Sequence, residues 1–128
     1  MVSDMATVGK CDWIIPDCEL PPPGEGVLKG HESVIVVNDS DKTAKIKVSI
    51  FFVDKEPYEN IEWTVEAKRV RCFRMNNLTD MCGYEVPLET QYAMKLESSE
   101  PIVVQYGRLD NRQTNLDKVF NHLKQERI

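Results

Sequence analysis

The sequence predicts a single all-β domain, an antiparallel β-sandwich or jelly roll with a short C-terminal helix. Several short apolar segments alternate with a period of two or are rich in β-branched residues, and turns rich in Pro, Gly, Asn and Asp separate them. Only the last segment changes to a helical period. A chain of 128 residues supports one core. We predict a flexible leader at 1–10, a sandwich domain at 11–113 and a helix at 114–128.

The first half of the chain contains two apolar segments that predict strands. Residues 11–15 are short and mostly apolar, and we expect Pro16 and the run Pro-Pro-Pro-Gly-Glu-Gly at 21–26 to prevent regular pairing after them. Residues 34–37 are a continuous Val-Ile-Val-Val run, which is typical of a strand buried on both faces. The Asn-Asp-Ser-Asp sequence at 38–41 then predicts a turn.

Residues 45–53 show the clearest alternation, with one apolar face opposite Lys45 and Lys47. The polar face becomes apolar at Phe51 and Val53, so we expect another element or subunit to cover this end. Residues 61–66 alternate again, and their spacing predicts a hairpin with 45–53.

The arginine-rich segment 68–74 places Arg69 and Arg71 on one face. Two interpretations stay open: these arginines bind an anion, or they pair across strands with the glutamates of 61–66. Residues 75–89 contain Asn-Asn, Cys-Gly and Pro, and predict a long loop.

A second hairpin is predicted near the end of the domain. Residues 91–97 alternate, the Ser-Ser-Glu-Pro sequence at 98–101 predicts a turn, and a β-branched run follows as a buried strand. After residue 113 the period changes, and apolar residues recur at i, i+3, i+4 and i+7 from Leu116 to Leu123. This pattern predicts an amphipathic helix, packed on the domain or at a subunit interface.

The overall charge and hydropathy exclude several classes of protein. A net charge of −5 argues against nonspecific binding to nucleic acid or anionic lipid. No segment approaches the roughly 20 apolar residues of a membrane span, and the N-terminus lacks a signal-peptide pattern, so we expect a cytoplasmic protein. Four cysteines (Cys11, Cys18, Cys72 and Cys82) lack the close spacing of a structural zinc site. We expect reduced thiols, no metal and no cofactor.

Polar side chains gather at predicted strand ends, where the loops of a sandwich meet. Their amide, guanidinium, imidazole and carboxylate groups suit a polar ligand or a subunit interface. The candidate residues are His31, Glu32, Arg69, Arg74, Gln105, Arg108, Asp110 and Arg112. Neighbouring strand residues point to opposite faces, so His31 and Glu32 would act as an acid and base pair only if the backbone turned there.

Several blocks in one order resemble the sensory rhodopsin transducer family, small proteins named for a partner of a microbial sensory rhodopsin. These blocks are Gly-His-Glu-Ser-Val at 30–34, Phe-Val-Asp-Lys-Glu-Pro at 52–57, Val-Glu-Ala-Lys-Arg at 65–69, Pro-Ile-Val-Val-Gln at 101–105 and Arg-Leu-Asp-Asn-Arg-Gln at 108–113. The resemblance implies a β-sandwich, a tetramer, a cytosolic signalling or adaptor role, a membrane receptor partner and a small, sugar-like ligand.

Residues and resemblance together favour a noncatalytic signalling or adaptor module, a homotetramer with a site for a small polar ligand. One alternative is a jelly-roll enzyme that uses His31 with Glu32 or Asp110 as acid and base. A second alternative is a purely structural interaction protein, in which the polar residues form only a subunit interface.

Overall fold

The computed structural model describes residues 8–111, and these residues form six β-strands and no helix. The strands are β1 (Lys10–Glu19), β2 (His31–Asn38), β3 (Ala44–Phe52), β4 (Tyr58–Val65), β5 (Arg69–Arg74) and β6 (Gln91–Leu109). The predicted all-β class is therefore confirmed. The predicted C-terminal helix and Arg112 lie outside the described residues. Within them, no helix has the length and apolar character to cross a membrane.

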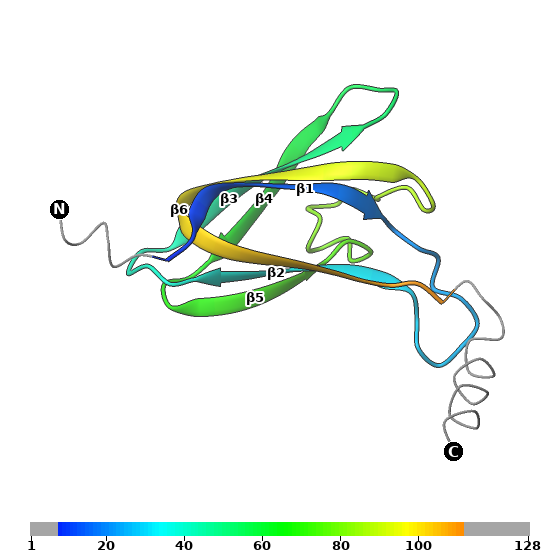
Figure 1. Cartoon of the computed structure of the whole chain (residues 1–128), viewed down its shortest axis with the longest axis horizontal. Coiled ribbons are helices and arrows are strands. Elements are labelled where there is room, and N and C mark those ends of the chain that lie inside the picture. Colours follow the sequence, from blue (N-terminus) through cyan, green and yellow to red (C-terminus); the bar gives the residue numbers. More distant parts are fainter. Residues whose placement is uncertain (1–7, 112–128) are drawn as a thin grey trace, which may run out of the picture.

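The long strand β6 organises the domain because it belongs to both layers of the curled antiparallel sheet. Its first half pairs with β1 and with β3, and its second half pairs with β2. The sheet order is β4-β3-β6-β2-β5, with β1 added alongside β6. Figure 1 shows β6 bending from a layer with β1, β3 and β4 into a layer with β2 and β5. This is a sandwich-like arrangement built around one shared strand.

The predicted turn at 98–101 is wrong, because β6 runs without interruption through these residues. The pairing of β6 with β3 ends at Ser98, and its pairing with β2 begins at Val103. Pro101 falls between the two sets of partners, where its missing N–H removes no bond from either ladder. The Ser99 hydroxyl accepts a hydrogen bond from the Lys45 backbone N–H at 2.9 Å, which holds the bend against β3.

The core lies between the two layers. Alternate residues of β3, β4 and the first half of β6 face inward, as the sequence pattern predicts, and the β3–β4 hairpin forms in that register. Trp63 of β4 stacks on Phe73 of β5 with ring centroids 4.0 Å apart, joining the layers. Leu20, Met75, Met81 and Val86 extend the core under the segment that links β5 to β6.

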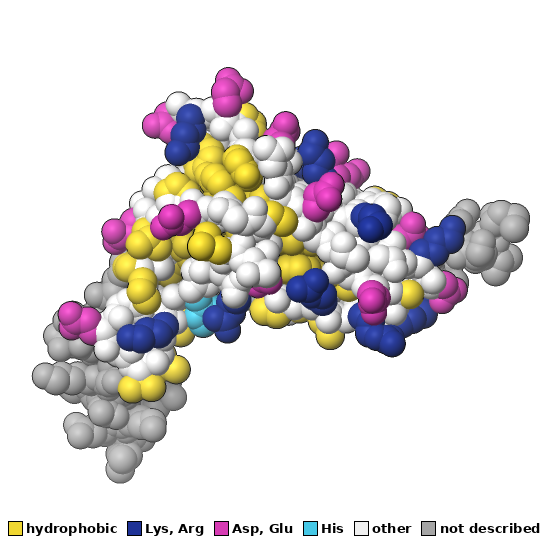
Figure 2. All heavy atoms as spheres, turned by 180° about the vertical axis from the view of Figure 1, so that it is seen from behind, with side chains coloured by type: hydrophobic (Ala, Val, Ile, Leu, Met, Phe, Trp, Pro, Cys, Tyr) yellow, Lys and Arg dark blue, Asp and Glu magenta, His cyan; other side chains and the backbone are white. Residues whose placement is uncertain are grey.

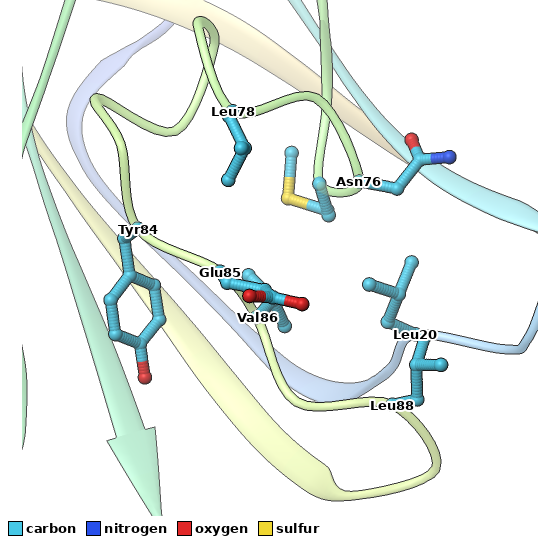
Figure 3. A pocket seen from close by; sticks show the side chains of 8 residues that line it. Leu20, Asn76, Leu78, Tyr84, Glu85, Val86 and Leu88 are labelled. Carbon is cyan, nitrogen blue, oxygen red and sulfur yellow. The ribbon is translucent and has the colours of Figure 1, made fainter.

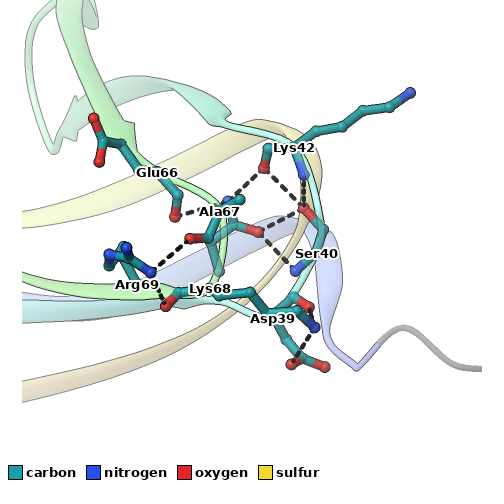
Figure 4. A network of polar contacts seen from close by, with 8 residues as sticks. Asp39, Ser40, Lys42, Glu66, Ala67, Lys68 and Arg69 are labelled. Carbon is teal, nitrogen blue, oxygen red and sulfur yellow. Dashed lines mark hydrogen bonds and ion pairs between the residues drawn. The ribbon is translucent and has the colours of Figure 1, made fainter.

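The buried side chain of Asn38 closes one end of the sandwich. Figure 4 shows the surrounding polar network, which includes Ser40, Lys42 and Lys68. Asn38 Nδ2 donates to the carbonyl oxygens of Lys42 at 2.7 Å and Val65 at 3.0 Å, and Asn38 Oδ1 accepts from Ser40. Lys68, at a positive φ of 57°, extends its Nζ to within 3.3 Å of Asp39 Oδ1. The β2–β3 turn and the β4–β5 turn are therefore tied together, at the opposite end of β2 from His31.

Candidate functional site

Glu32 is buried between the layers near the start of β2, with none of its surface exposed. Its carboxylate accepts hydrogen bonds from the hydroxyls of Tyr92 at 2.5 Å and Tyr106, and from the backbone N–H of Glu19 at 2.9 Å. The two tyrosines come from the two halves of β6. We call Glu32, Tyr92 and Tyr106 the Glu32 centre. Because three donors satisfy the buried carboxylate, it links β1, β2 and both halves of β6.

The groups around the Glu32 centre are held in their protonated forms. Burial raises the pKa of the Cys18 thiol to about 12, with Glu32 and Asp17 adding to the shift and Arg108 opposing it. Burial, together with the Glu32 carboxylate, also raises the pKa of the Tyr92 and Tyr106 hydroxyls. Near neutral pH the tyrosines therefore act as donors, and Cys18 is not a thiolate that attacks a substrate or binds a metal.

The outer face of the same strands carries a different set of polar residues. Ser33 pairs with both Arg74 and Gly107, so these three residues share a cross-strand row. His31 lies two residues before Ser33, and Gln105 lies two residues before Gly107, which places both on that face.

We call His31, Arg74 and Gln105 the outer-face group. Arg74 and Gln105 are exposed, and His31 is half-buried. A Cβ added at Gly107 would meet nothing within 4 Å, so the space above the row is open. The backbone N–H of Arg74 donates to Asp80 at 2.9 Å, which fixes the end of β5. The register therefore places three predicted residues on one face, with His31 and Gln105 on either side of the row that contains Ser33 and Arg74.

The other candidate residues do not join this group. Glu32 lies on the inner face. Its cross-strand partner in β6 is Arg108, whose side chain is exposed at the end of the strand. Asp110 is exposed beyond the end of β6. Arg69 pairs with Asn38 at the other end of β5. It is about 17 Å from Arg74 along the strand, at 3.4 Å per residue. Its guanidinium donates to the carbonyl oxygens of Ala67 and Lys68.

The proposed acid and base pair of His31 and Glu32 is not assembled. The Glu32 carboxylate points inward, whereas His31 Nδ1 lies 2.8 Å from the Lys29 carbonyl oxygen, to which it donates. The two groups occupy opposite faces of β2. Among residues 8–111 there is also no group of three side chains suited to hold a metal ion.

One of the two open interpretations, the pairing of Arg69 and Arg71 with glutamates of the preceding strand, is not realised among the described residues, because β5 pairs with β2 and not with β4. Arg71 instead lies over the Phe73 ring at 4.6 Å and donates to the Thr64 carbonyl oxygen at 3.2 Å. The arginine is held by an aromatic face and a backbone acceptor, which sequence alternation does not specify.

A separate apolar hollow of about 130 Å³ opens beside the end of β1. It is lined by Leu20, Met75, Asn76, Leu78, Tyr84, Glu85, Val86 and Leu88. Figure 3 shows Leu20 and Leu78 facing it from different segments. Tyr84 stacks on Tyr58 with ring centroids 4.0 Å apart, which anchors one wall to β4. We refer to this feature as the hollow.

Figure 2 shows apolar side chains spread across the face opposite to that in Figure 1, with charged side chains around them. Exposed large apolar residues of the molecule include Val53 on the β3–β4 turn and Leu78 and Leu88 at the hollow. The expectation that another element covers Val53 is not met within residues 8–111, where this side chain is 81% exposed.

Sequence reasoning missed three residues that shape these sites. Nothing in the local sequence indicated that the hydroxyls of Tyr92 and Tyr106 would meet on one carboxylate. Asn111 donates to the carbonyl oxygens of Pro23 and Leu28, which closes the 21–30 loop onto the end of β6. The usable signal was the position of Glu32 in step with Val34 and Val36, which places it on the inner face of the strand, where a buried carboxylate requires donors.

Comparisons with known proteins identify the family of this chain. The family model described as Anabaena sensory rhodopsin transducer matches residues 8–121. The chain belongs to the sensory rhodopsin transducer family. All eight candidate residues fall within the matched range, and the resemblance detected in the sequence is confirmed.

Solved structures of similar proteins share the transducer fold. Anabaena sensory rhodopsin transducer is 34% identical with a TM-score of 0.69, and the match covers 79% of this chain and 98% of that one. A Thermotoga maritima protein, numbered 1070, is 30% identical with a TM-score of 0.73, and the match covers 83% and 85% of the two chains. No curated protein matches the chain. Membership of the transducer family supports a signalling role.

Proposed function

We propose that the protein is a noncatalytic, cytoplasmic signalling or adaptor module that works as a homotetramer and binds a small polar ligand and a membrane receptor. One observation supports the proposed assembly. The core of the domain covers only the inner face of two continuous apolar runs, at 34–37 and 102–104. Such runs are typical of strands buried on both faces.

The uncovered face of β5-β2-β6 bears an apolar row in cross-strand register. Val37 pairs with Val70 and with Val103, and the three side chains are 41%, 60% and 38% exposed. Exposed β-branched residues aligned across three strands form a flat surface suited to packing against a second sheet. A second copy of the chain would supply that sheet, which supports an oligomer built through this face.

The outer-face group supports the proposed ligand site. Arg74 offers a guanidinium with several donors, and Gln105 offers both a donor and an acceptor. The hydrogen bond from His31 Nδ1 to Lys29 makes Nε2 an acceptor in the neutral ring. A hydroxyl-rich or anionic molecule above Gly107 would meet donors and acceptors of both kinds, as a sugar-like ligand requires.

Assembly is tested by light scattering, which gives the mass of the particle in solution. The wild-type protein should have four times the chain mass, and Val70→Asp should form smaller particles because a charge would be buried in the interface. Val27→Asp is the matched control, since Val27 is 98% exposed but lies on the 21–30 loop, away from the valine row. A monomeric wild type, or a tetramer unaffected by Val70→Asp, would refute the proposed interface.

Ligand and receptor binding are tested separately from assembly. Calorimetric titration with a panel of saccharides and small anions should show binding that Arg74→Ala removes and Arg69→Ala retains, because Arg69 lies at the other end of β5. Co-purification with a sensory rhodopsin in lipid nanodiscs tests the receptor. Binding that survives Arg74→Ala unchanged would move the ligand away from the outer-face group.

A further inference from the structure

The hollow has the size and character of a docking site for apolar side chains. Its volume of about 130 Å³ is comparable to one large aliphatic or aromatic side chain, and six of its eight lining residues are Leu, Met, Val or Tyr. Leu78 and Leu88 at the hollow are 56% and 49% exposed. Anchoring of an apolar side chain in such a recess is typical of protein interaction surfaces.

The described part of the chain ends beside the segment that leads into the hollow. Asn111 Nδ2 donates to the Pro23 carbonyl oxygen at 3.1 Å and also to that of Leu28. A Cβ added at Gly24 would lie 2.4 Å from Asn111 Oδ1, so the 21–30 loop closely surrounds this residue. Leu20, which lines the hollow, is three residues before Pro23, at most about 11 Å along the chain.

The 17 residues after Asn111 contain apolar side chains that suit the apolar lining of the hollow. Their apolar stripe has helical spacing and consists of Leu116, Val119, Phe120 and Leu123. Leu116 is five positions after Asn111, so the chain between them can span up to about 17 Å. The stripe can therefore reach the hollow within the same chain.

The charges of the two segments are complementary. Residues 75–89, which form most of the hollow, contain three acidic residues and no Lys or Arg. Residues 112–128 contain four basic and two acidic residues, although the whole chain is acidic. Opposite net charges on the two surfaces favour their association and fix its orientation.

We propose that residues 114–124 dock in the hollow of their own chain, with the apolar stripe facing Leu20, Leu78 and Leu88. The docked segment shields Leu78 and Leu88 from water and occupies the recess between the end of β1 and the 75–88 segment. A protein partner that used the hollow would have to displace it, so the segment acts as an internal competitor. This docking is independent of the outer face, because it uses neither the valine row nor the outer-face group.

Methyl NMR of the full chain, labelled at Met, Leu and Val, tests the docking. Phe120→Asp should shift the signals of Met75, Leu78 and Leu88 and speed amide exchange across 76–88 by about tenfold, the change for a loss of 1.4 kcal/mol. Asn121→Asp is the matched control, since it adds the same charge on the opposite face of the predicted helix. Its spectrum should match the wild type at the hollow.

The reciprocal variant and mixed labelling complete the test. Leu78→Asp, at an exposed position, should shift the signals of Leu116, Val119 and Leu123. Mixed labelled and unlabelled chains distinguish docking within a chain from exchange between copies. Contacts seen only between chains would overturn the proposal, as would hollow signals unaffected by Phe120→Asp.

Discussion

The two faces of β2 place neighbouring residues of one motif in opposite environments. Glu32 is completely buried and bound by three donors, whereas His31 lies on the outer face beside open space. The inner residue connects the layers of the domain, and the outer residue belongs to the group that we propose as a ligand site. Polar residues that are adjacent in a strand thus lie in separate environments, one inside the core and one on the surface. Substitutions on each face should therefore affect different measurements.

The largest effect is expected for Glu32→Ala. The substitution leaves the hydroxyls of Tyr92 and Tyr106 and the Glu19 N–H without their acceptor in a buried space. We expect the free energy of unfolding to fall by about 3 kcal/mol or more, given about 1–3 kcal/mol for each unsatisfied buried group. Urea denaturation followed by circular dichroism measures it. A loss below about 1 kcal/mol would show that the Glu32 centre does not hold the layers together.

Removing one donor should have a smaller effect. Tyr106→Phe retains the ring but deletes one of the three hydrogen bonds to Glu32, and we expect a loss of about 1–2 kcal/mol in the free energy of unfolding. Tyr58→Phe is a suitable control, because Tyr58 stacks on Tyr84 and no hydrogen bond joins its hydroxyl to Glu32 in the structure. Equal losses in the two variants would contradict the role given to Tyr106.

Alkaline pH should weaken the inner face specifically. In the folded chain, burial raises the pKa of Cys18 from its ordinary value of 9.0 to about 12, so the unfolded chain loses this proton first. Stability from the neutral thiol is therefore complete below about pH 9 and decreases as the pH rises toward 12. Cys18→Ala should show a shallower decline in denaturant midpoint over that range, because only the tyrosines then contribute. An unchanged slope would contradict the prediction.

The smallest effect on folding is expected on the outer face. Arg74→Ala removes an exposed side chain while its backbone N–H still donates to Asp80, so the free energy of unfolding should change by less than about 0.5 kcal/mol. The same variant should lose the proposed ligand, measured by calorimetry. A destabilisation comparable to that of Glu32→Ala would erase the contrast between the two faces.

Local sequence pattern was sufficient for most of the strands. The alternation in 45–53 and 61–66 predicted the β3–β4 hairpin, because side chains in a strand point to opposite faces with a period of two. The Ser-Ser-Glu-Pro sequence at 98–101 led to a wrong prediction of a turn, because similar residues occur in turns and at bends within long strands. What keeps β6 continuous is the availability of β1 and β3 on one side of Pro101 and β2 on the other.

The sequence predicted only part of the spatial arrangement of the candidate residues. Their types and their positions near strand ends indicated His31, Arg74 and Gln105, and the structure places these three on one face. It separates Glu32 and Arg69 from them, because residue type does not specify which face becomes the core or which end of a strand meets which partner. The hollow was missed since the 75–89 segment has turn residues and no repeating period.

The sequence by itself determined the all-β class, the family and the chemical groups available for binding. These properties depend on local periodicity and on the order of short motifs along the chain. Only the tertiary structure decided that β6 joins two layers, that Glu32 is buried by tyrosines from both halves of one strand, and that Arg74 and Gln105 share a face. Such contacts join residues up to 74 positions apart, and their geometry is set by strand pairing rather than by neighbouring residues.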